Sequence, residues 1–426
     1  MPRFTARIHH EPYDQTEHFF AIDFPKVETF DIVDLDFLAF RAWAFSLSSD
    51  SVEYVFSFDE SRIYTANTTR LDVRSHFPRA PIICGLHMII PFHKIFKVGI
   101  ISQGRPVWLA TVELAPLMVL EGSNGYLFLD NDDNQSVDQY SGKLPIDSEH
   151  LANWENYFKE IKTRLTDQSF VFCLAPAKEY VFADHYPVPR AGLTPHDQFV
   201  HAFDKYVKII NPLELLHRDR HLTYSKNDTH WTDYGANIVA QEICNSLDVV
   251  YRDPQFSYTV TTVTGDLGIK FNPQRTEPLF TANISHLNES CFDNQIPVRG
   301  NVLAFTNTHA SIDETCLIFG SSSSASIAVQ LTSTFKRVVR IFSGADIDYD
   351  LIQHENPRYI VIVFASRFLV RAPAADFSLG VEILRKLNVM NTSDLERVKQ
   401  HNNRYSHHLK NSHYSALVQT LSDYVS

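Results

Sequence analysis

The sequence predicts an α/β fold, a three-layer domain with a parallel sheet, preceded by a smaller β-sandwich domain. Two observations predict the larger domain: all-apolar runs of the length of buried parallel strands, and amphipathic helical segments between them. A third predicts the sandwich, because the region before residue 116 consists of short alternating strands. We therefore expect a β-sandwich module over residues 1–115 and an α/β domain over residues 116–426.

The N-terminal region contains short segments in which aromatic and aliphatic residues alternate with polar ones. This pattern is typical of antiparallel strands with one buried face. A module of this kind either contacts carbohydrate or serves as a structural, dimerising domain, and the sequence leaves both open. The expected strands include residues 19–22, 42–45, 52–56 and 108–112.

The C-terminal region alternates predicted helices and buried strands. Apolar residues recur at helical spacing over 150–165, and Thr232 can cap a second helix that extends to residue 247. Because ligands in open α/β sheets lie at the carboxyl ends of the strands, Pro176 and Gly320 mark two expected positions near a site. The predicted buried strands are residues 170–174, 315–319, 338–342 and 359–364.

Composition and charge exclude several classes of function. Lys and Arg number 38 against 50 Asp and Glu, so the net charge is −12, which disfavours a nucleic-acid partner. The five cysteines have no disulfide-framework spacing, and we expect buried thiols in a reducing compartment. The N-terminus lacks the apolar core of a secretory signal, and charged and histidine side chains interrupt the longest apolar region, residues 81–101. We expect a cytoplasmic protein.

The segment 226–232, Lys-Asn-Asp-Thr-His-Trp-Thr, contains a carboxylate and an imidazole two residues apart. In an extended segment, residues i and i+2 point to the same side, so Asp228 can orient the ring of His230 for proton transfer. A zinc site explains the pair less well, because no His-x-x-x-His or Cys-x-x-Cys ligand set lies nearby, and we expect no metal.

A candidate nucleophile follows about ninety residues later, where the apolar strand 315–319 runs into Gly320 and four serines. A buried strand, a Gly-x-Ser turn and a helix start together make a plausible nucleophile elbow. Alternatively, serines after a glycine form a flexible turn or cap a helix.

Several short motifs occur along the C-terminal region. They are Asp-Thr-His-Trp-Thr at 228–232 followed by Gly235-Ala236, Gly-Ser-Asn-Gly-Tyr-Leu-Phe at 122–128, Pro-Ala-Lys at 176–178, Gly-Asp-Leu at 265–267 and the Gly-x-Ser turn. Together they resemble the alginate O-acetyltransferase-like branch of the SGNH/GDSL hydrolase superfamily. The resemblance covers roughly residues 116–390, and it departs at Ser321, where the family usually has Asp in a Gly-Asp-Ser motif.

The resemblance implies an SGNH-like catalytic domain that transfers acetyl groups to a sugar hydroxyl of a bacterial surface polysaccharide or its precursor. Ser322 would be the nucleophile, His230 the general base and Asp228 the residue that orients it. Candidate substrate-binding residues are Tyr224, Lys226, Trp231 and Arg367.

The implied partners are a polysaccharide or oligosaccharide acceptor and an acetyl donor. The donor would be acetyl-CoA or a membrane protein that relays acetyl groups, and no other cofactor is expected. Two alternatives stay open: a carbohydrate acetylesterase that uses the same three residues, and a non-catalytic glycan-binding scaffold.

Overall fold

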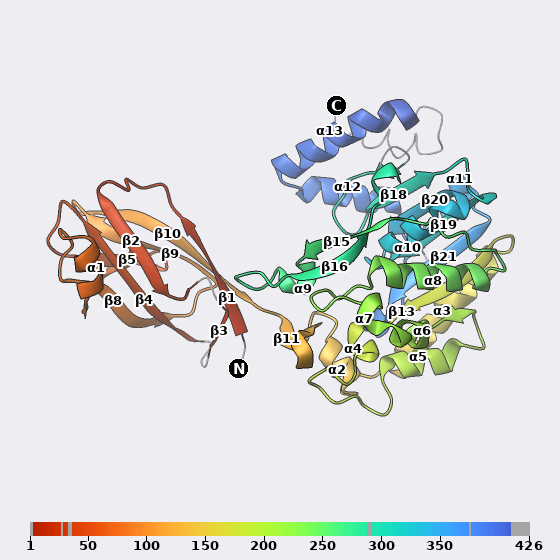
Figure 1. Ribbon diagram of the computed structural model, residues 1–426, viewed down its shortest axis with the longest axis horizontal. Coiled ribbons are helices and arrows are strands. Elements are labelled where there is room, and N and C mark those ends of the chain that lie inside the picture. Colours follow the sequence, from red (N-terminus) through yellow and green to blue (C-terminus); the bar gives the residue numbers. More distant parts are fainter. Residues whose placement is uncertain (1–2, 27–28, 33–35, 288–290, 375, 410–426) are drawn as a thin grey trace. The chain divides into compact units, whose positions relative to one another are not determined.

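The computed structural model describes residues 3–26, 29–32, 36–287, 291–374 and 376–409, and the chain divides into two compact units (Figure 1). The first unit comprises Met1–Val119 together with Asp266–Arg275, and the second comprises Leu120–Gly265 together with Thr276–Ser426. The sequence predicted one boundary at residue 116, whereas the structure also assigns the excursion Asp266–Arg275 to the first unit. The α/β class predicted for the C-terminal region is confirmed.

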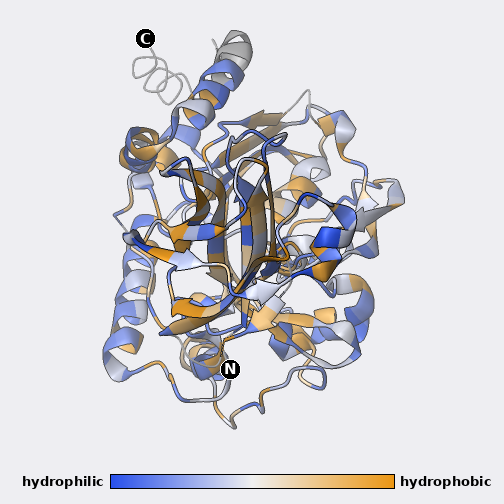
Figure 2. Ribbon diagram, turned by 90° about the vertical axis from the view of Figure 1, so that its left-hand side faces the viewer, coloured by the Kyte–Doolittle hydropathy of each residue, from blue (hydrophilic) through white to orange (hydrophobic). Residues whose placement is uncertain are grey.

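The first unit contains two antiparallel sheets, with strand orders β3-β1-β10-β9-β5-β6 and β2-β4-β8-β7, whose buried side chains form one core. Phe40, Phe56 and Phe96 pack within this core with ring centroids 5.1–6.1 Å apart. Figure 2 shows hydrophobic and hydrophilic residues alternating along several strands, as expected for strands with one buried face. The elements are β1 (Arg3–His10), β2 (His18–Phe24), β3 (Thr29–Asp31), β4 (Phe37–Ser46), β5 (Glu53–Phe56), β6 (Asp59–Thr65), β7 (Thr68–Thr69), α1 (Leu71–His76), β8 (Ile83–Pro91), β9 (Ile95–Ser102) and β10 (Arg105–Pro116).

The second unit is built on a seven-stranded sheet of order β14-β13-β21-β19-β20-β18-β17. The strands from β14 to β20 pair in parallel, and β18 and β17 add an antiparallel edge. The carboxyl ends of β13, β19, β20 and β21 therefore meet at one edge of the sheet. The strands are β13 (Ser169–Ala175), β14 (Ile209–Ile210), β17 (Cys291–Asp293), β18 (Val302–Thr306), β19 (Ile312–Gly320), β20 (Phe335–Phe342) and β21 (Tyr359–Ala365).

Helices cover both faces of this sheet. Alternate residues of a strand therefore pack into two different hydrophobic cores. Leu317 and Phe319 of β19 pack with α3, α5, α11 and α12, whereas Cys316 and Ile318 pack with α6, α8 and α10. The helices are α2 (Ser136–Tyr140), α3 (Ser148–Arg164), α4 (Lys178–Val181), α5 (Pro195–Phe203), α6 (Leu213–Arg218), α7 (Arg220–Thr223), α8 (Asp233–Ser246), α9 (Gly265–Gly268), α10 (Ser324–Gln330), α11 (Tyr349–Glu355), α12 (Leu379–Val389) and α13 (Thr392–Leu409). Two short sheets complete the list, β11 (Val119–Glu121) with β12 (Leu127–Leu129) and β15 (Tyr258–Val263) with β16 (Glu277–Ala282).

The two helices predicted from periodicity are confirmed, and side-chain caps fix where each begins. Asp147 accepts a hydrogen bond from the backbone of His150 at the start of α3, and the Thr232 hydroxyl accepts one from Gly235 at the start of α8. A capping oxygen satisfies a backbone N–H that has no partner within the helix. The cap at Thr232 therefore ends the 226–232 segment at a defined point.

All five cysteines are unpaired, as predicted. Burial raises the pKa of the Cys244 thiol to about 12, so this side chain stays protonated and behaves as an apolar core residue. Among the described residues, no helix combines the length and the apolar character needed to cross a bilayer.

His196 in α5 is 2% exposed and packs against Tyr180 with ring centroids 4.9 Å apart, and this burial lowers its pKa from 6.5 to about 4. The unfolded chain therefore binds a proton between pH 6.5 and 4 that the folded chain does not, and acid favours unfolding. We expect this residue alone to reduce the free energy of unfolding by about 3 kcal/mol across that range. Urea denaturation at several pH values should show that the free energy of unfolding falls less steeply with decreasing pH for His196→Phe than for the parent chain. Equal acid sensitivity of the two chains would contradict this assignment.

Candidate active site

The serine turn follows β19 at the carboxyl edge of the seven-stranded sheet. A Cβ atom on Gly320 would lie 2.7 Å from the carbonyl oxygen of Val363 in β21, so only glycine fits this close approach. The next residue, Ser321, donates its backbone N–H to the same carbonyl at 3.0 Å. The chain then leaves the sheet, and α10 begins at Ser324. Ser322 is thereby presented at the strand end, between the sheet and the helix.

The Asp228–His230 segment lies in a loop that the chain closes on itself. Tyr224 and Trp231 form an antiparallel bridge, and Thr232 donates its backbone N–H to the carbonyl of Thr223 at 2.8 Å. Within the loop, the backbone N–H of His230 donates to the Asp228 carboxylate at 2.8 Å. The carboxylate and the ring are therefore fixed relative to one another by local hydrogen bonds.

The structure brings Asp228, His230 and Ser322 together. The Nδ1 atom of His230 lies 2.7 Å from Oδ1 of Asp228, and its Nε2 atom lies 2.6 Å from Oγ of Ser322. Since a carboxylate only accepts, Nδ1 carries the proton and Nε2 is left to accept from the serine hydroxyl. The side chains of His230 and Asp228 are 30% and 27% exposed, which leaves the group accessible to small molecules.

Lys178 in α4 holds the backbone of the loop that contains Asp228 and His230, a role that the sequence did not predict. Its side chain is 2% exposed, and the ammonium donates to the carbonyl oxygens of Ser225, Lys226 and Asp228 at 3.1, 2.9 and 2.7 Å. These three acceptors surround one buried cation, so the charge is satisfied by backbone dipoles. The Pro-Ala-Lys motif at the end of β13 is therefore coupled directly to the loop that contains Asp228.

Replacing Lys178 with methionine should destabilise the second unit by about 2–4 kcal/mol, because one buried and two partly buried carbonyl groups lose their shared donor. Chemical denaturation of the two chains measures this difference. The matched control is Lys226→Met. Lys226 is exposed and donates to one carbonyl, that of Asn124, at 3.1 Å, so its replacement should change stability by no more than about 0.5 kcal/mol. Similar losses in both variants would contradict the positioning role of Lys178.

Arg340 in β20 holds the serine turn through three hydrogen bonds. Its guanidinium donates to the Ser324 hydroxyl at 2.8 Å, to the Ser321 carbonyl at 3.1 Å and to the Asn301 side chain at 2.8 Å. Arg340 is 2% exposed, and burial lowers its pKa to about 10, which still leaves it charged at neutral pH. A single arginine inside the apolar run 338–342 was the sequence signal for this residue.

The prediction that Tyr224 and Trp231 line an acceptor pocket does not hold, because the structure buries both. Tyr224 is 2% exposed and donates its hydroxyl to the carbonyl of Pro176 at 2.8 Å. Trp231 is 5% exposed and donates its indole N–H to Ser326 of α10 at 2.8 Å. Both side chains connect the Asp228–His230 loop to the scaffold.

The other two predicted binding residues keep partly accessible side chains. Lys226 is exposed and lies over the ring of Tyr126. Arg367 follows β21, lies over the Phe368 ring and is close to buried Glu179. Burial raises the pKa of Glu179 to about 7, and the charges of Arg367 and Lys178 oppose that rise. The structure therefore associates Arg367 with an internal carboxyl group.

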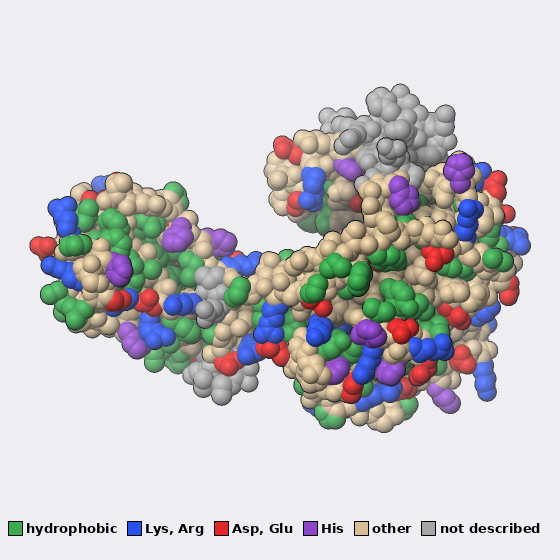
Figure 3. All heavy atoms as spheres, viewed as in Figure 1, with side chains coloured by type: hydrophobic (Ala, Val, Ile, Leu, Met, Phe, Trp, Pro, Cys, Tyr) green, Lys and Arg blue, Asp and Glu red, His purple; other side chains and the backbone are tan. Residues whose placement is uncertain are grey.

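Figure 3 shows acidic and basic side chains interspersed on one face of the second unit.

Comparison with known proteins confirms the resemblance to the acetyltransferase branch of the SGNH superfamily. Residues 119–267 match the family described as "SGNH hydrolase-like domain, acetyltransferase AlgX". The matched segment is less than half of the chain, and it includes Asp228 and His230 but ends before Ser322. Among curated proteins, none matches the chain.

Several solved structures are similar in part. Bacillus cereus PatB1 with a sulfonyl adduct matches with 16% identity and a TM-score of 0.42, covering 59% of this chain and 94% of that one. The O-acetyltransferase domain of Pseudomonas putida AlgJ matches with 18% identity and a TM-score of 0.38, covering 63% and 98%. A DHHW family protein from Eubacterium siraeum matches with 14% identity and a TM-score of 0.41, covering 60% and 96%.

Proposed function

We propose that this chain, whose residues 119–267 match an SGNH hydrolase-like acetyltransferase domain, transfers acetyl groups to a sugar hydroxyl of a bacterial surface polysaccharide or its precursor. One observation carries the proposal: the Ser322 hydroxyl, the His230 ring and the Asp228 carboxylate form a continuous chain with contacts of 2.6 and 2.7 Å. This arrangement has the geometry of a Ser-His-Asp triad, in which the histidine activates an otherwise weak nucleophile.

In the first half of the proposed reaction, Ser322 takes the acetyl group from a donor. His230 accepts the serine proton at Nε2 as Oγ attacks the acetyl carbonyl, and it then protonates the leaving group of the donor. Asp228 stabilises the imidazolium that forms in between. The product is an acetyl ester on Ser322.

In the second half, a sugar hydroxyl replaces the donor. His230 accepts the proton of this hydroxyl as its oxygen attacks the acetyl-serine carbonyl, and the serine oxygen leaves with the proton from His230. The acetyl group is then an ester of the sugar, and the enzyme is regenerated.

Backbone N–H groups of the serine turn are the candidates for stabilising the tetrahedral intermediates. Within the described part of the chain, the N–H groups of Ser322 and Ser323 donate no hydrogen bond to another residue. Arg340 holds the turn that presents them through the Ser321 carbonyl. Loss of one such donor from an oxyanion site typically costs about 3–4 kcal/mol of transition-state stabilisation.

We place the reaction in the cytoplasm with acetyl-CoA as the donor, while a membrane protein that relays acetyl groups is the alternative source. Intact-mass measurement after incubation with acetyl-CoA or 4-nitrophenyl acetate tests the first half-reaction. The expected result is one added acetyl group on the parent chain and none on Ser322→Ala. An unmodified parent chain with both donors, together with unchanged ester turnover in Ser322→Ala and His230→Ala, would overturn the proposal.

A carbohydrate acetylesterase with the same three residues is the competing function, and the acceptor decides between the two. Acetylated glycan that forms at the expense of free acetate supports transfer. Free acetate that is released at the same rate with and without glycan supports hydrolysis. For the N-terminal module, which the sequence predicts over residues 1–115, we propose the same role with either function: it would bind carbohydrate or mediate dimerisation.

A further inference from the structure

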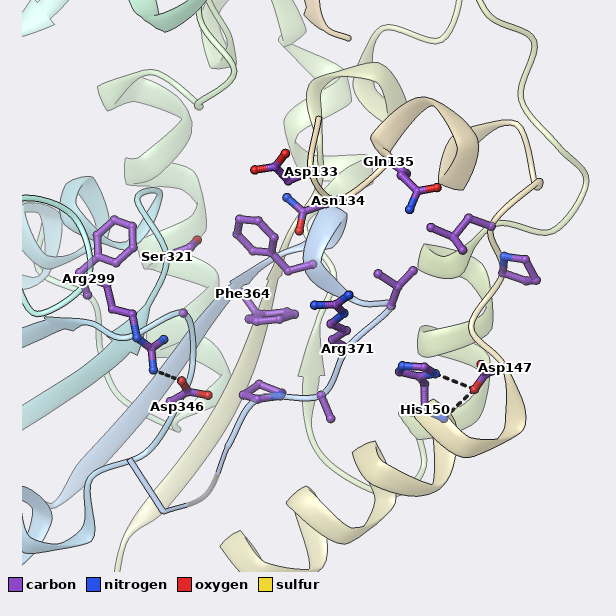
Figure 4. Close-up of a pocket in the computed structure, with 18 residues that line it drawn as sticks. Asp133, Asn134, Gln135, Asp147, His150, Arg299, Ser321, Asp346, Phe364 and Arg371 are labelled. Carbon is purple, nitrogen blue, oxygen red and sulfur yellow. Dashed lines mark hydrogen bonds and ion pairs between the residues drawn. The ribbon is translucent and has the colours of Figure 1, made fainter. Parts of the chain in front are cut away.

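A pocket of about 450 Å³ opens beside the serine turn, at the carboxyl ends of β19, β20 and β21 (Figure 4). Ser321 lines it, whereas Asp228, His230 and Ser322 do not. Ser321 is 1% exposed, and its hydroxyl has no hydrogen-bond partner within the described part of the chain. Because a buried hydroxyl without a partner is unfavourable, a ligand or water in the pocket would satisfy it. The pocket therefore lies one residue from the proposed nucleophile.

Aromatic, aliphatic, amide and charged side chains all line the pocket. Phe342, Phe364 and Phe368 contribute the aromatic surface, with the rings of Phe364 and Phe368 5.9 Å apart. Asn134 and Gln135 contribute amides, which Figure 4 shows on the side of the pocket across from Arg371. Flat apolar surface together with a few amide and hydroxyl groups suits a sugar ring, which has apolar C–H faces and a hydroxyl periphery.

The charges that line the pocket nearly cancel. Arg299 pairs with Asp346, and the ring of His150 lies 2.7 Å from the carboxylate of Asp147. The two charged lining residues that remain, Asp133 and Arg371, have opposite signs and form no ion pair within the described residues. The chain as a whole carries a net charge of −12, which repels a polyanion at long range.

We infer that this pocket binds one uncharged sugar unit of the acceptor glycan, placing the neighbouring unit at Ser322. The inference rests on the proposed acetyl transfer, because it is that reaction that makes the bound glycan an acetyl acceptor. The sugar ring would lie on the phenylalanine surface, with hydroxyls toward Asn134, Gln135 and the Ser321 hydroxyl. Neutral glycans, and not acidic ones, are therefore the expected acceptors.

Saturation-transfer NMR on the full chain tests this directly, without turnover. The probes are three neutral tetrasaccharides (cellotetraose, mannotetraose and chitotetraose) and two acidic ones (tetragalacturonate and tetramannuronate). We expect at least one neutral probe to bind, and no acidic probe to bind more tightly. Binding of acidic probes alone, or of none of the five, overturns the inference.

A matched pair of substitutions tests whether the neutral probe binds in this pocket. Phe368→Leu should lower the affinity for the neutral probe by about tenfold, since the substitution removes the aromatic face but keeps most of the apolar volume. Phe280→Leu, at a residue of β16 that is 58% exposed, should leave the affinity within about twofold. Equal affinities of the parent and Phe368→Leu would place the sugar elsewhere and overturn the inference.

Failure of the pocket and failure of the reaction are distinguishable. If a neutral probe binds through Phe368 but Ser322 never takes an acetyl group, the pocket stands and the proposed reaction fails. If Ser322 is acetylated but the neutral probes do not bind, the reaction stands and the pocket assignment fails.

Discussion

Replacing Ser322 with alanine is expected to abolish acetyl-enzyme formation and to lower the rate of acetyl transfer by about 10⁴-fold or more. The substitution removes the atom that bonds to the acetyl group in the proposed reaction. The contacts that hold the turn come from the backbone of Gly320 and Ser321 and from Arg340. The fold should therefore survive. Initial rates on an activated acetyl ester measure the effect, with circular dichroism to confirm that the variant is folded.

The adjacent serine supplies the control for this experiment. Ser323 lies in the same turn, and its side chain makes no hydrogen bond within the described residues, although its carbonyl accepts from the Ser326 hydroxyl at 3.2 Å. Ser323→Ala should keep the activity of the parent within about twofold. Loss of activity in Ser323→Ala alone would show that the reactive serine is misassigned, and not that the chain lacks a serine mechanism.

Much of the second unit could be predicted because its strands and helices have strong periodic patterns. Residues 315–319 contain only apolar or small side chains. Residues 316–320 of β19 are buried, with Leu317 facing one helical layer and Ile318 the other. The helix after Thr232 combines a capping hydroxyl with apolar residues at helical spacing. Patterns of this kind depend on local sequence, and a single chain is enough to show them.

The supporting residues of the site could not be predicted, because their partners are distant in the chain and are mostly backbone carbonyl groups, with two polar side chains for Arg340. Lys178 lies 47 residues before the first of the carbonyls that it binds, and Arg340 lies 19 residues after the Ser321 carbonyl. Sequence alone shows a lysine after a strand and an arginine within an apolar run, and neither pattern identifies the groups that the side chain binds. Tyr224 and Trp231 were misassigned for a related reason, since an aromatic residue beside a catalytic motif can face either the ligand or the core.

Replacing Asp228 with asparagine is expected to lower the acetyl-transfer rate by about 10³–10⁴-fold with little change in stability. The Oδ1 atom of Asp228 accepts from both the backbone N–H and the Nδ1–H of His230, at 2.8 and 2.7 Å. An asparagine oxygen can keep one or both contacts, but it lacks the negative charge that stabilises the imidazolium during proton transfer. The loss should therefore appear in kcat, with the KM of the acceptor nearly unchanged.

Asp233 provides the matched control for the removal of this carboxylate. It lies in the first turn of α8, five positions beyond Asp228, and its carboxylate accepts from the backbone N–H of Ala282 at 2.8 Å. Asp233→Asn makes the same chemical change at a residue with a structural partner, so kcat should stay within about twofold of the parent. If Asp228→Asn also stays near the parent rate, His230 does not depend on this carboxylate, and the three-residue mechanism would have to be replaced by a Ser322–His230 pair.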